Sequence, residues 1–408
     1  MAYQMTHFVN DSACKAPPVL IVDDSKAQRR LVSRSLAKWG YETIEAESGA
    51  AALAICQATT VDVIVSDWMM PGMSGVEFCK AFRELKDRRA YFILLTAQTE
   101  REVLAEGLES GADDFLSKPF NAVELRARIR AGERLISAQR ELAQQNAELS
   151  NAYAAIDRDL RGARVFQQAL VPNRSWSLEQ FDVSLLFQSS GHVGGDLVGY
   201  FQVNPHEIGV YSVDVSGHGV ASALMTARIA GYFSDSAPDR NIALTRVGKG
   251  YGMIPLEDAF KQLNANLQDD QDSDQYLTMA LARVNLNTGR VEICSAGHPS
   301  PAVQRKDGTV SFLELWSTPI GLLDDVEFCK TEIDLAPGDR LLLYSDGLTE
   351  CPDTSGNLLD EDGLASLLKQ NANRTGQDLV RSLVTSLGSF HGNMEFPDDL
   401  SAALIQRT

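Results

Sequence analysis

Residues 19–25 read VLIVDDS, a short apolar run that ends in two adjacent aspartates. Similar runs recur along the next hundred residues: TIEAES at 43–48, VDVIVSD at 61–67, YFILLTA at 91–97 and DDFLSKPF at 113–120. Stretches with helical periodicity lie between them, as in AQRRLVSRSLAKWG at 27–40. Short buried strands that alternate with helices are typical of a parallel sheet covered on both faces. The pattern predicts a doubly wound α/β domain over residues 17–137, preceded by a tail at 1–16.

Polar residues stand at the ends of these predicted strands, namely Asp23, Asp24, Asp67, Thr96 and Lys118. The carboxyl ends of parallel strands meet at one edge of a sheet, which is where ligands bind. Three carboxylates at that edge repel one another unless a divalent cation joins them, and their hard oxygen ligands favour Mg²⁺. Asp67 is then placed to act as a nucleophile that forms an acyl phosphate, with Lys118 paired to the phosphoryl oxygens. One such aspartate alone is often a helix cap, but five polar residues in this order favour a site.

Composition limits the remaining functions. The formal net charge of −18 disfavours nucleic acid as a partner, because an acidic surface repels phosphate backbones. The sequence contains no run of 18 apolar residues and no secretory signal, so we expect a cytoplasmic protein without a membrane span. The six cysteines are scattered and form no CxxC pair, which argues against a disulfide framework and a thiolate metal site.

A heptad repeat follows the first predicted domain, with core positions at Leu135, Leu142, Leu149, Ile156, Ala163 and Leu170. No proline occurs between Asn121 and Val171, so one continuous helix is expected. A sustained heptad is typical of a two-stranded coiled coil, in which Gln139 and Asn146 would fix the register. The repeat predicts a signalling helix at 138–171 and a parallel homodimer. The alternative is a single amphipathic helix that lies on its own domain.

Pro172 ends the helical stretch, and the remaining sequence groups many strands with a few long helices. This mixture predicts an α+β sandwich over residues 172–408. Four acidic motifs mark its turns: GGD at 194–196, VDVSGHG at 213–219, SDG at 345–347 and PDD at 397–399. Clusters made only of carboxylates suit Mg²⁺ or Mn²⁺, and two such ions can activate water and hold a phosphate ester. Any single motif of this kind is more often a structural turn.

Residues 17–122 resemble a response-regulator receiver domain, and WMMPGMSG after Asp67 matches the loop of that family. The resemblance implies the acidic pair Asp23 and Asp24, the phospho-acceptor Asp67, the switch residues Thr96 and Phe115, and the lysine Lys118. Phe115 stands where tyrosine is common. The family binds Mg²⁺ and receives its phosphoryl group from a sensor histidine kinase, so both are expected here.

Residues 163–408 resemble the PPM (type 2C) protein phosphatases, in particular the bacterial branch that acts on stress and sporulation regulators. The shared motifs occur in the family's order: GGD, DVSGHG, SAGHPSPAV, LLYSDGLTE and DDLSAAL. The resemblance implies metal ligands at Asp196, Asp214, the backbone carbonyl of Val215, Asp346 and Asp398, with Asp399 in place of Asp398 if the register shifts by one. It further implies two Mn²⁺ or Mg²⁺ ions, a phosphoserine or phosphothreonine protein as substrate, and an anti-sigma factor antagonist as that protein.

Histidines are the other candidates for chemistry, because an imidazole can protonate a leaving oxygen. Eukaryotic members of the family place their acid histidine two residues after the metal aspartate, where this sequence has Ser216. His218 is a candidate acid, although a turn or packing role is favoured. His298 is expected to be structural, and His192 lies close enough to GGD to approach a phosphate.

Residues 163–172, ARVFQQALVP, resemble the helix that opens the bacterial phosphatase domains and couples them to regulation. The heptad helix would then transmit the state of Asp67 to the metal site. Two other functions are less compatible with the sequence. An adaptor with a degenerate phosphatase fold should lack metal aspartates, which this sequence retains, and a DNA-binding regulator should carry a basic recognition helix, which it does not.

Overall fold

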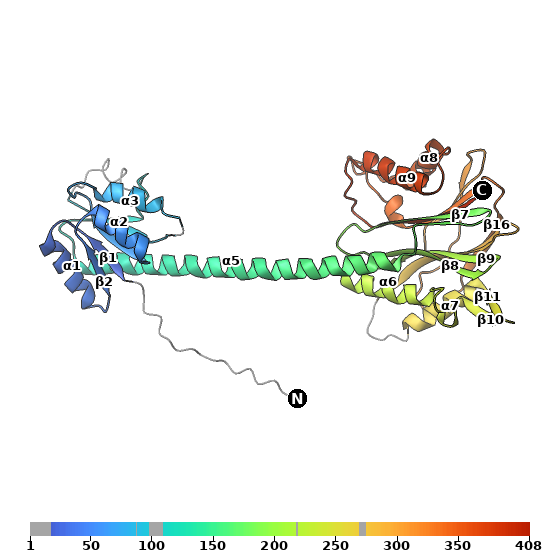
Figure 1. Ribbon diagram of the computed structural model, residues 1–408, viewed down its shortest axis with the longest axis horizontal. Coiled ribbons are helices and arrows are strands. Elements are labelled where there is room, and N and C mark those ends of the chain that lie inside the picture. Colours follow the sequence, from blue (N-terminus) through green and yellow to red (C-terminus); the bar gives the residue numbers. More distant parts are fainter. Residues whose placement is uncertain (1–17, 87, 98–108, 218, 269–274) are drawn as a thin grey trace, which may run out of the picture. The chain divides into compact units, whose positions relative to one another are not determined.

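The computed structural model describes residues 18–86, 88–97, 109–217, 219–268 and 275–408. The chain divides into two compact units, Met1–Tyr153 and Ala154–Thr408, which we call the N-terminal and C-terminal units. Helix α5 (Ala122–Leu170) runs through the boundary (Figure 1).

Five parallel strands form the sheet of the N-terminal unit in the order β2-β1-β3-β4-β5. Their bounds are β1 Val19–Val22, β2 Thr43–Ala46, β3 Val63–Asp67, β4 Tyr91–Thr96 and β5 Asp114–Ser117. The order reverses between β1 and β3, so the carboxyl ends of these two strands flank the ligand-binding crevice of a doubly wound sheet. The predicted α/β fold is confirmed.

Helices cover both faces of this sheet: α1 (Lys26–Ala37), α2 (Gly49–Ala58), α3 (Gly75–Arg83) and the start of α5. A capping box begins α3, because the Ser74 side chain accepts from the Glu77 backbone while the Glu77 side chain accepts from the Ser74 backbone. The connection from β4 to β5 includes residues 98–108, which lie outside the described part of the chain.

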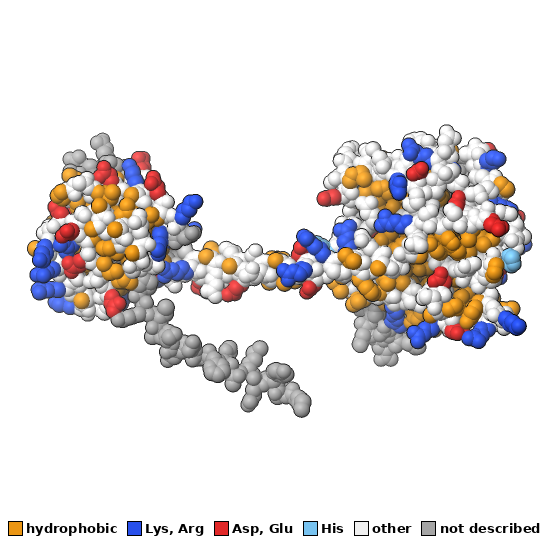
Figure 2. All heavy atoms as spheres, viewed as in Figure 1, with side chains coloured by type: hydrophobic (Ala, Val, Ile, Leu, Met, Phe, Trp, Pro, Cys, Tyr) orange, Lys and Arg blue, Asp and Glu red, His pale blue; other side chains and the backbone are white. Residues whose placement is uncertain are grey.

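Helix α5 is both the last helix of the N-terminal unit and the first of the C-terminal unit. Its first turns pack Leu125 and Ile129 on the sheet, and Ile136 further along is also buried. The heptad leucines Leu135, Leu142 and Leu149 are exposed within one chain, from 44% at Leu135 to 58% at Leu142, whereas Leu170 is partly buried against the core of the C-terminal unit. Hydrophobic side chains therefore lie at the surface of α5 among polar ones (Figure 2). In the described chain, no helix combines the length and the apolar character needed to cross a membrane.

Two antiparallel sheets stack in the C-terminal unit. The first has the order β16-β13-β12-β9-β8 and the second the order β15-β14-β17-β18-β7-β6. The bounds of the first are β8 Asp196–Asn204, β9 Glu207–Val215, β12 Leu277–Asn285, β13 Arg290–Ala296 and β16 Cys329–Asp334. Those of the second are β6 Ser175–Ser177, β7 Phe181–Gln188, β14 Ala302–Gln304, β15 Val310–Phe312, β17 Arg340–Tyr344 and β18 Leu400–Arg407. Aliphatic side chains of both sheets fill the space between them.

Helices cover the outer faces of this sandwich (Figure 1). Helices α6 (Val220–Tyr232) and α7 (Leu256–Gln268) pack on the first sheet, and α8 (Asp360–Gln370) and α9 (Gly376–His391) pack on the second. A hairpin of β10 (Leu244–Val247) and β11 (Gly250–Met253) stands beside α7 in the chain, and short 3₁₀ turns occur at Pro238–Arg240 and Asp346–Leu348. The α+β sandwich predicted for the C-terminal part is confirmed.

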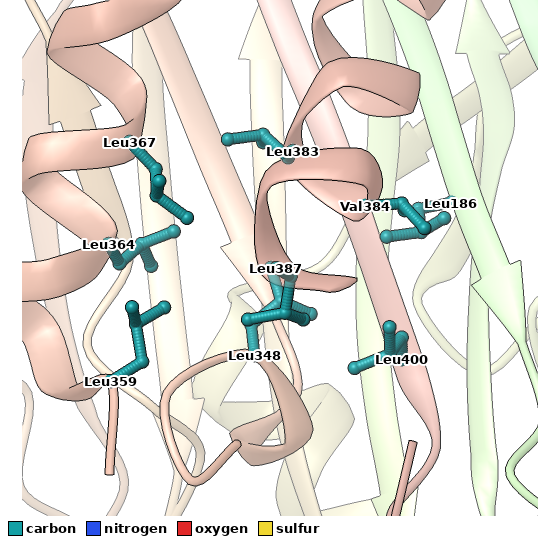
Figure 3. Close-up of a pocket in the computed structure, with 9 residues that line it drawn as sticks. All are labelled: Leu186, Leu348, Leu359, Leu364, Leu367, Leu383, Val384, Leu387 and Leu400. Atoms are coloured by element: carbon teal, nitrogen blue, oxygen red, sulfur yellow. The ribbon is translucent and has the colours of Figure 1, made fainter. Parts of the chain in front are cut away.

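A small cavity of about 10 Å³ lies under α8 and α9, and Figure 3 shows its leucine-rich lining. Leu348 and Leu400 form part of this lining. Each directly follows an acidic motif, since Leu348 comes after Asp346 and Gly347 and Leu400 comes after Asp399. Apolar packing therefore fixes the backbone on which two of the acidic motifs stand.

Candidate functional site

The acidic residues of the N-terminal unit meet at the carboxyl ends of β1 and β3. Asp23, Asp24 and Asp67 each offer a carboxylate oxygen within 4.8 Å of the other two. Asp23 is buried, Asp24 is exposed, and Asp67 is intermediate. Three oxygens at this spacing, open to solvent on one side, fit a hard cation such as Mg²⁺ that retains some of its water.

Lys118 binds this cluster directly. Its Nζ atom donates to Asp67 Oδ1 at 2.7 Å, to Asp23 Oδ2 at 3.1 Å and to Gln28 Oε1 at 2.8 Å. Burial raises the pKa of Asp67, while the hydrogen bond and charge of Lys118 oppose the shift. The ammonium therefore stands where it can pair with a charge carried on Asp67.

The two predicted switch residues lie on the neighbouring strands. Thr96 ends β4 at the same edge of the sheet and is buried. Phe115 lies on β5 opposite Leu94 and is partly buried against the core. Thr96 is one strand away from Asp67, and Phe115 is two strands away. The structure therefore brings the acidic residues and Lys118 into contact and places the switch residues on the neighbouring strands.

Sequence reasoning missed Arg29 and Gln28. Arg29 is 9% exposed and donates to the backbone oxygens of Asp23 and Asp24, which holds the acidic turn in shape. The Gln28 side-chain oxygen accepts a hydrogen bond from Lys118, which also donates to Asp23 and Asp67. Their positions in the first turn of α1, directly after the acidic pair, are the signal that would have found them.

In the C-terminal unit, two candidate ligands face each other across neighbouring strands. Asp196 on β8 and Asp214 on β9 are direct partners in the antiparallel register. Like charges at such positions repel and destabilise a sheet. Asp196 is 2% exposed, and its Oδ2 atom has no hydrogen-bond partner among the described residues. A buried carboxylate oxygen without a donor, next to a second carboxylate, fits a bound cation.

The second sheet supplies the other acidic motifs. Asp346 follows β17 and Asp398 precedes β18, and these strands are paired. A Cβ atom on Gly347 would lie 2.0 Å from the backbone oxygen of Asp399, so only glycine allows the two motifs to approach this closely. The packed sheets thus bring carboxylates as far apart in the sequence as Asp196 and Asp398 to one end of the sandwich.

The pKa values of these carboxyl groups are raised because the groups are buried close to one another. Burial is the largest cause throughout, and neighbouring carboxylates add to it. The pKa of Asp196 is raised well above its ordinary value, that of Asp214 rises to about 7, and that of Asp346 rises to about 6. Glu350, which sequence reasoning did not single out, contributes repulsion to both Asp214 and Asp346. Divalent cations relieve this repulsion, so the residues present fit the metals that the sequence predicts.

Asp398 and Asp399 differ in what they contact. Asp399 is buried, and its Oδ1 atom accepts from the backbone nitrogen and hydroxyl of Ser190 at 2.7 and 3.0 Å. Its Oδ2 atom accepts from the Gly195 nitrogen at 2.8 Å. Asp398 is exposed and contributes repulsion to Asp346. These contacts favour Asp398 as the ligand and give Asp399 the task of holding the GGD turn.

The backbone of the first two motifs is drawn close together. Val215 donates its N–H to Gly195 O at 3.0 Å, and a Cβ atom on Gly195 would lie 2.5 Å from Val215 O. The Val215 carbonyl therefore lies against the GGD turn. Among the described residues no three carboxylates of this unit offer oxygens within 4.8 Å of one another, so they are more widely spread than the N-terminal cluster.

The histidines have different surroundings. His298 is buried, with Nδ1 2.8 Å from Thr278 Oγ1 and Nε2 3.0 Å from Ser212 Oγ. Burial lowers its pKa to about 3, so it is neutral at physiological pH and has a structural environment. His192 is exposed, and its Nε2 atom lies 2.8 Å from Asp157 on α5. His218 lies outside the described residues.

Helix α5 reaches the GGD turn through a buried glutamine. Gln167 is 1% exposed; its Oε1 atom accepts from Gly194 N at 3.1 Å, and its Nε2 atom donates to Gly194 O at 2.8 Å. The same amide lies 3.3 Å from Thr226 Oγ1 on α6. One side chain therefore satisfies both backbone groups of Gly194 and ties the motif to α5. Gln167 is a polar residue that occupies the same heptad core position as Gln139, and this was the signal in the sequence that could have predicted its role.

These pKa shifts predict how the metal-free C-terminal unit responds to pH. A carboxyl whose folded pKa is raised contributes stability that is present below its ordinary pKa of about 4 and is lost as pH rises through the folded value. With Asp214 at about 7 and Asp346 at about 6, the chelated protein should lose stability as pH rises from about 5 to 7.

Thermal unfolding in EDTA and in excess Mn²⁺, followed across this pH range, measures the effect. Mn²⁺ should stabilise the protein increasingly as pH rises, because binding requires ionised carboxylates. If the melting temperature of the metal-free protein instead rises between about pH 5 and pH 7, the raised pKa values of Asp214 and Asp346 are contradicted.

Comparison with known families agrees with this arrangement. The family model described as Stage II sporulation protein E (SpoIIE) matches residues 204–408, and the model described as response regulator receiver domain matches residues 19–130. The first match covers half of the chain and contains the motifs of Asp214, Asp346 and Asp398.

Individual relatives are similar to this chain over part of its length. The phosphoserine phosphatase RsbP of Bacillus subtilis is 29% identical over 51% of this chain, and the chain spans about half (48%) of the length of RsbP. The phosphoserine phosphatase RsbU of the same species is 25% identical over 65% of this chain and 74% of its own. The SiaA-PP2C domain of Pseudomonas aeruginosa shares the fold, with a TM-score of 0.51 and 20% identity over 63% of this chain and 98% of that domain. The chain belongs to the Stage II sporulation protein E family, with a PPM-type phosphatase domain that follows a response-regulator receiver domain.

Proposed function

We propose that this protein hydrolyses phosphoserine or phosphothreonine on another protein in a metal-dependent reaction, and that phosphorylation of its receiver domain sets the rate. The observation that carries the proposal is the cross-strand pair Asp196–Asp214, in which the buried Asp196 Oδ2 has no hydrogen-bond partner among the described residues and Asp346 lies near enough to Asp214 to raise its pKa. Such a pair is costly in a sheet unless it binds cations.

The position of each residue suggests its role in the reaction. Bound Mn²⁺ or Mg²⁺ would supply Lewis acidity and lower the pKa of water. Asp196, Asp214, Asp346, Asp398 and the Val215 carbonyl would hold the two ions. Asp399 orients the GGD turn through Gly195, and the neutral His298 supports Thr278, which pairs with Asp214 across β9 and β12. No acid histidine is needed in this account.

The receiver domain would take its phosphoryl group from a sensor histidine kinase. Asp67 is the acceptor, Asp23 and Asp24 would hold Mg²⁺ with it, and Lys118 would pair with the phosphoryl oxygens. Thr96 and Phe115 would respond to the new charge. Helix α5 would then carry the change to Gly194 through Gln167.

We propose a phosphorylated anti-sigma factor antagonist as the substrate, with sigma-factor control as the output. The support is the resemblance of the motifs to the bacterial regulatory branch and the match to RsbP and RsbU. The alternative is a pseudophosphatase-type adaptor that binds a sigma factor or its regulator without hydrolysis.

A hydrolysis assay separates these functions. With Mn²⁺, the protein should turn over p-nitrophenyl phosphate and a phosphoserine protein, and Asp346→Ala should lose this activity because one metal ligand is missing. Beryllofluoride, which mimics a phosphoryl group on Asp67, should change the rate about 5- to 150-fold, the usual range of allosteric coupling.

Asp67→Asn is the matched control, because it keeps the side-chain shape and should abolish the beryllofluoride response alone. Absence of turnover in every state, with a folded protein and bound Mn²⁺, would support the adaptor instead.

We also propose that α5 pairs with the α5 of a second chain as a parallel coiled coil. Leu142→Glu with Leu149→Glu would place charges in that seam and should weaken the dimer at least about 100-fold, since each buried leucine contributes roughly 2 kcal/mol or more. Analytical ultracentrifugation measures the change. Gln144→Glu with Asn151→Glu adds the same charge on the opposite side of the helix and should leave the dimer intact. A dimer that survives the leucine substitutions would exclude this seam.

A further inference from the structure

A cleft of about 570 Å³ opens beside the metal-binding end of the C-terminal unit. One wall is the loop Gln188–Gly191, which leads into the GGD turn. The other wall is the loop Asn393–Pro397, which leads into Asp398. Ser190 in the first wall donates to Asp399 Oδ1 through both its backbone nitrogen and its hydroxyl, so the cleft and the acidic site share a framework.

None of the aspartates assigned to metal binding is among the described residues that line this cleft. A phosphoryl group held by those aspartates would therefore lie next to the cleft rather than in it. The volume exceeds what a single phosphate needs and is sufficient for a few residues of extended polypeptide. Both walls belong to loops, which is where binding specificity is commonly carried.

Arg164 gives the cleft its positive charge. It projects from the last turns of α5, is exposed, and forms no hydrogen bond or ion pair with any residue that the structure describes. Glu395 on the opposite wall is the one carboxylate of the lining, and Met394 beside it is 53% exposed and offers an apolar contact. An unpaired guanidinium in a concave surface is suited to a carboxylate ligand.

We infer that this cleft binds the polypeptide that flanks the phosphoserine of the substrate, and that Arg164 selects an acidic side chain in that segment. The inference rests on the proposed phosphatase function and adds the sequence preference of the substrate. Glu395 limits the acidity that the cleft accepts. Because Arg164 lies three residues before Gln167 on α5, the helix that holds the GGD turn also contributes to substrate selection.

Two synthetic phosphoserine peptides of equal length test this, one with acidic residues beside the phosphoserine and one with neutral residues in their place. The measured quantity is the ratio of kcat/KM for the acidic peptide to that for the neutral peptide, with Mn²⁺ and the full-length protein. Arg164→Ala should lower this ratio about 10-fold, and Glu395→Gln should raise it a few-fold, because the two side chains carry opposite charges. Arg158→Ala is the matched control, since Arg158 is exposed on the same helix outside the cleft and should leave the ratio unchanged.

Fluorescence anisotropy of the labelled acidic peptide on Asp346→Ala protein gives a second readout that does not require turnover. Here Arg164→Ala should weaken binding about 10-fold at low ionic strength, and added salt should reduce the difference. If Arg164→Ala changes neither the kcat/KM ratio nor the affinity for the acidic peptide, the inference is overturned and the phosphatase proposal remains intact. Failure of the unmodified protein to hydrolyse p-nitrophenyl phosphate would instead count against the phosphatase proposal, and the binding experiment would still decide whether Arg164 selects acidic peptides.

Discussion

Replacing Asp196 with asparagine is expected to lower metal-dependent hydrolysis of p-nitrophenyl phosphate by at least about 10³-fold. Asp196 supplies a buried oxygen that has no hydrogen-bond partner in the described part of the chain, and it faces Asp214 on the neighbouring strand. Asparagine keeps the size of the side chain but removes the charge that a cation requires. The loss should therefore come from metal binding and chemistry rather than from packing.

Stability measurements distinguish this explanation from simple misfolding. In EDTA, the Asp196→Asn protein should melt at the same temperature as the unmodified protein or higher, because one charge of a repelling cross-strand pair is gone. In Mn²⁺, it should gain less stability than the unmodified protein. Asp378→Asn removes a carboxylate from the exposed face of α9 and should change neither activity nor the response to Mn²⁺. A lower melting temperature in EDTA would indicate that Asp196 has a structural role that asparagine cannot fill.

Replacing Gln167 with alanine should weaken Mn²⁺ binding about 10- to 100-fold, the range found when a group that orients a metal ligand is removed. Gln167 satisfies both the N–H and the carbonyl of Gly194, two residues before Asp196. Without it, two buried backbone groups lose their partner and the GGD turn is free to move. Isothermal titration calorimetry with Mn²⁺ measures this directly and does not depend on turnover.

Two variants of neighbouring chemistry sharpen that experiment. Gln168→Ala truncates the adjacent and exposed glutamine on the same helix and should bind Mn²⁺ normally. Gln167→Glu keeps an oxygen for the Gly194 N–H but loses the donor to the Gly194 carbonyl, so it should also bind weakly. In addition, Gln167→Ala should reduce the response of the phosphatase to beryllofluoride if α5 acts through this contact. Normal Mn²⁺ affinity in the alanine variant would show that α5 does not control the metal site through Gln167.

Much of the fold follows from short-range patterns in the sequence. The alternation of buried strands and amphipathic helices predicts the doubly wound N-terminal sheet, and the strand order places Asp23, Asp24 and Asp67 where parallel strands end. All strands of a parallel sheet end at the same edge, so the order of the motifs was sufficient to predict that these three aspartates lie together. The heptad likewise predicts one continuous helix, and α5 runs unbroken from Ala122 to Leu170.

The arrangement of the acidic residues at one end of the C-terminal unit could be predicted only as a set of motifs. Antiparallel sheets leave open which strands pair and in what register, and a shift of one residue reverses which face a side chain occupies. The facing of Asp196 and Asp214, and the division of tasks between Asp398 and Asp399, are therefore properties of the packed sheets. Contacts such as Ser190 with Asp399 join residues 209 positions apart, and no local pattern records them.

The sequence by itself determined the two domain types, the continuous helix between them and the acidic motifs, because periodicity and motif order are local properties of the chain. Only the tertiary structure decided that Gln167 holds Gly194, that His298 is buried and neutral, and that Arg164 lines a cleft beside the acidic site. These roles depend on burial and on partners from distant segments, which exist only once both sheets and α5 have packed together.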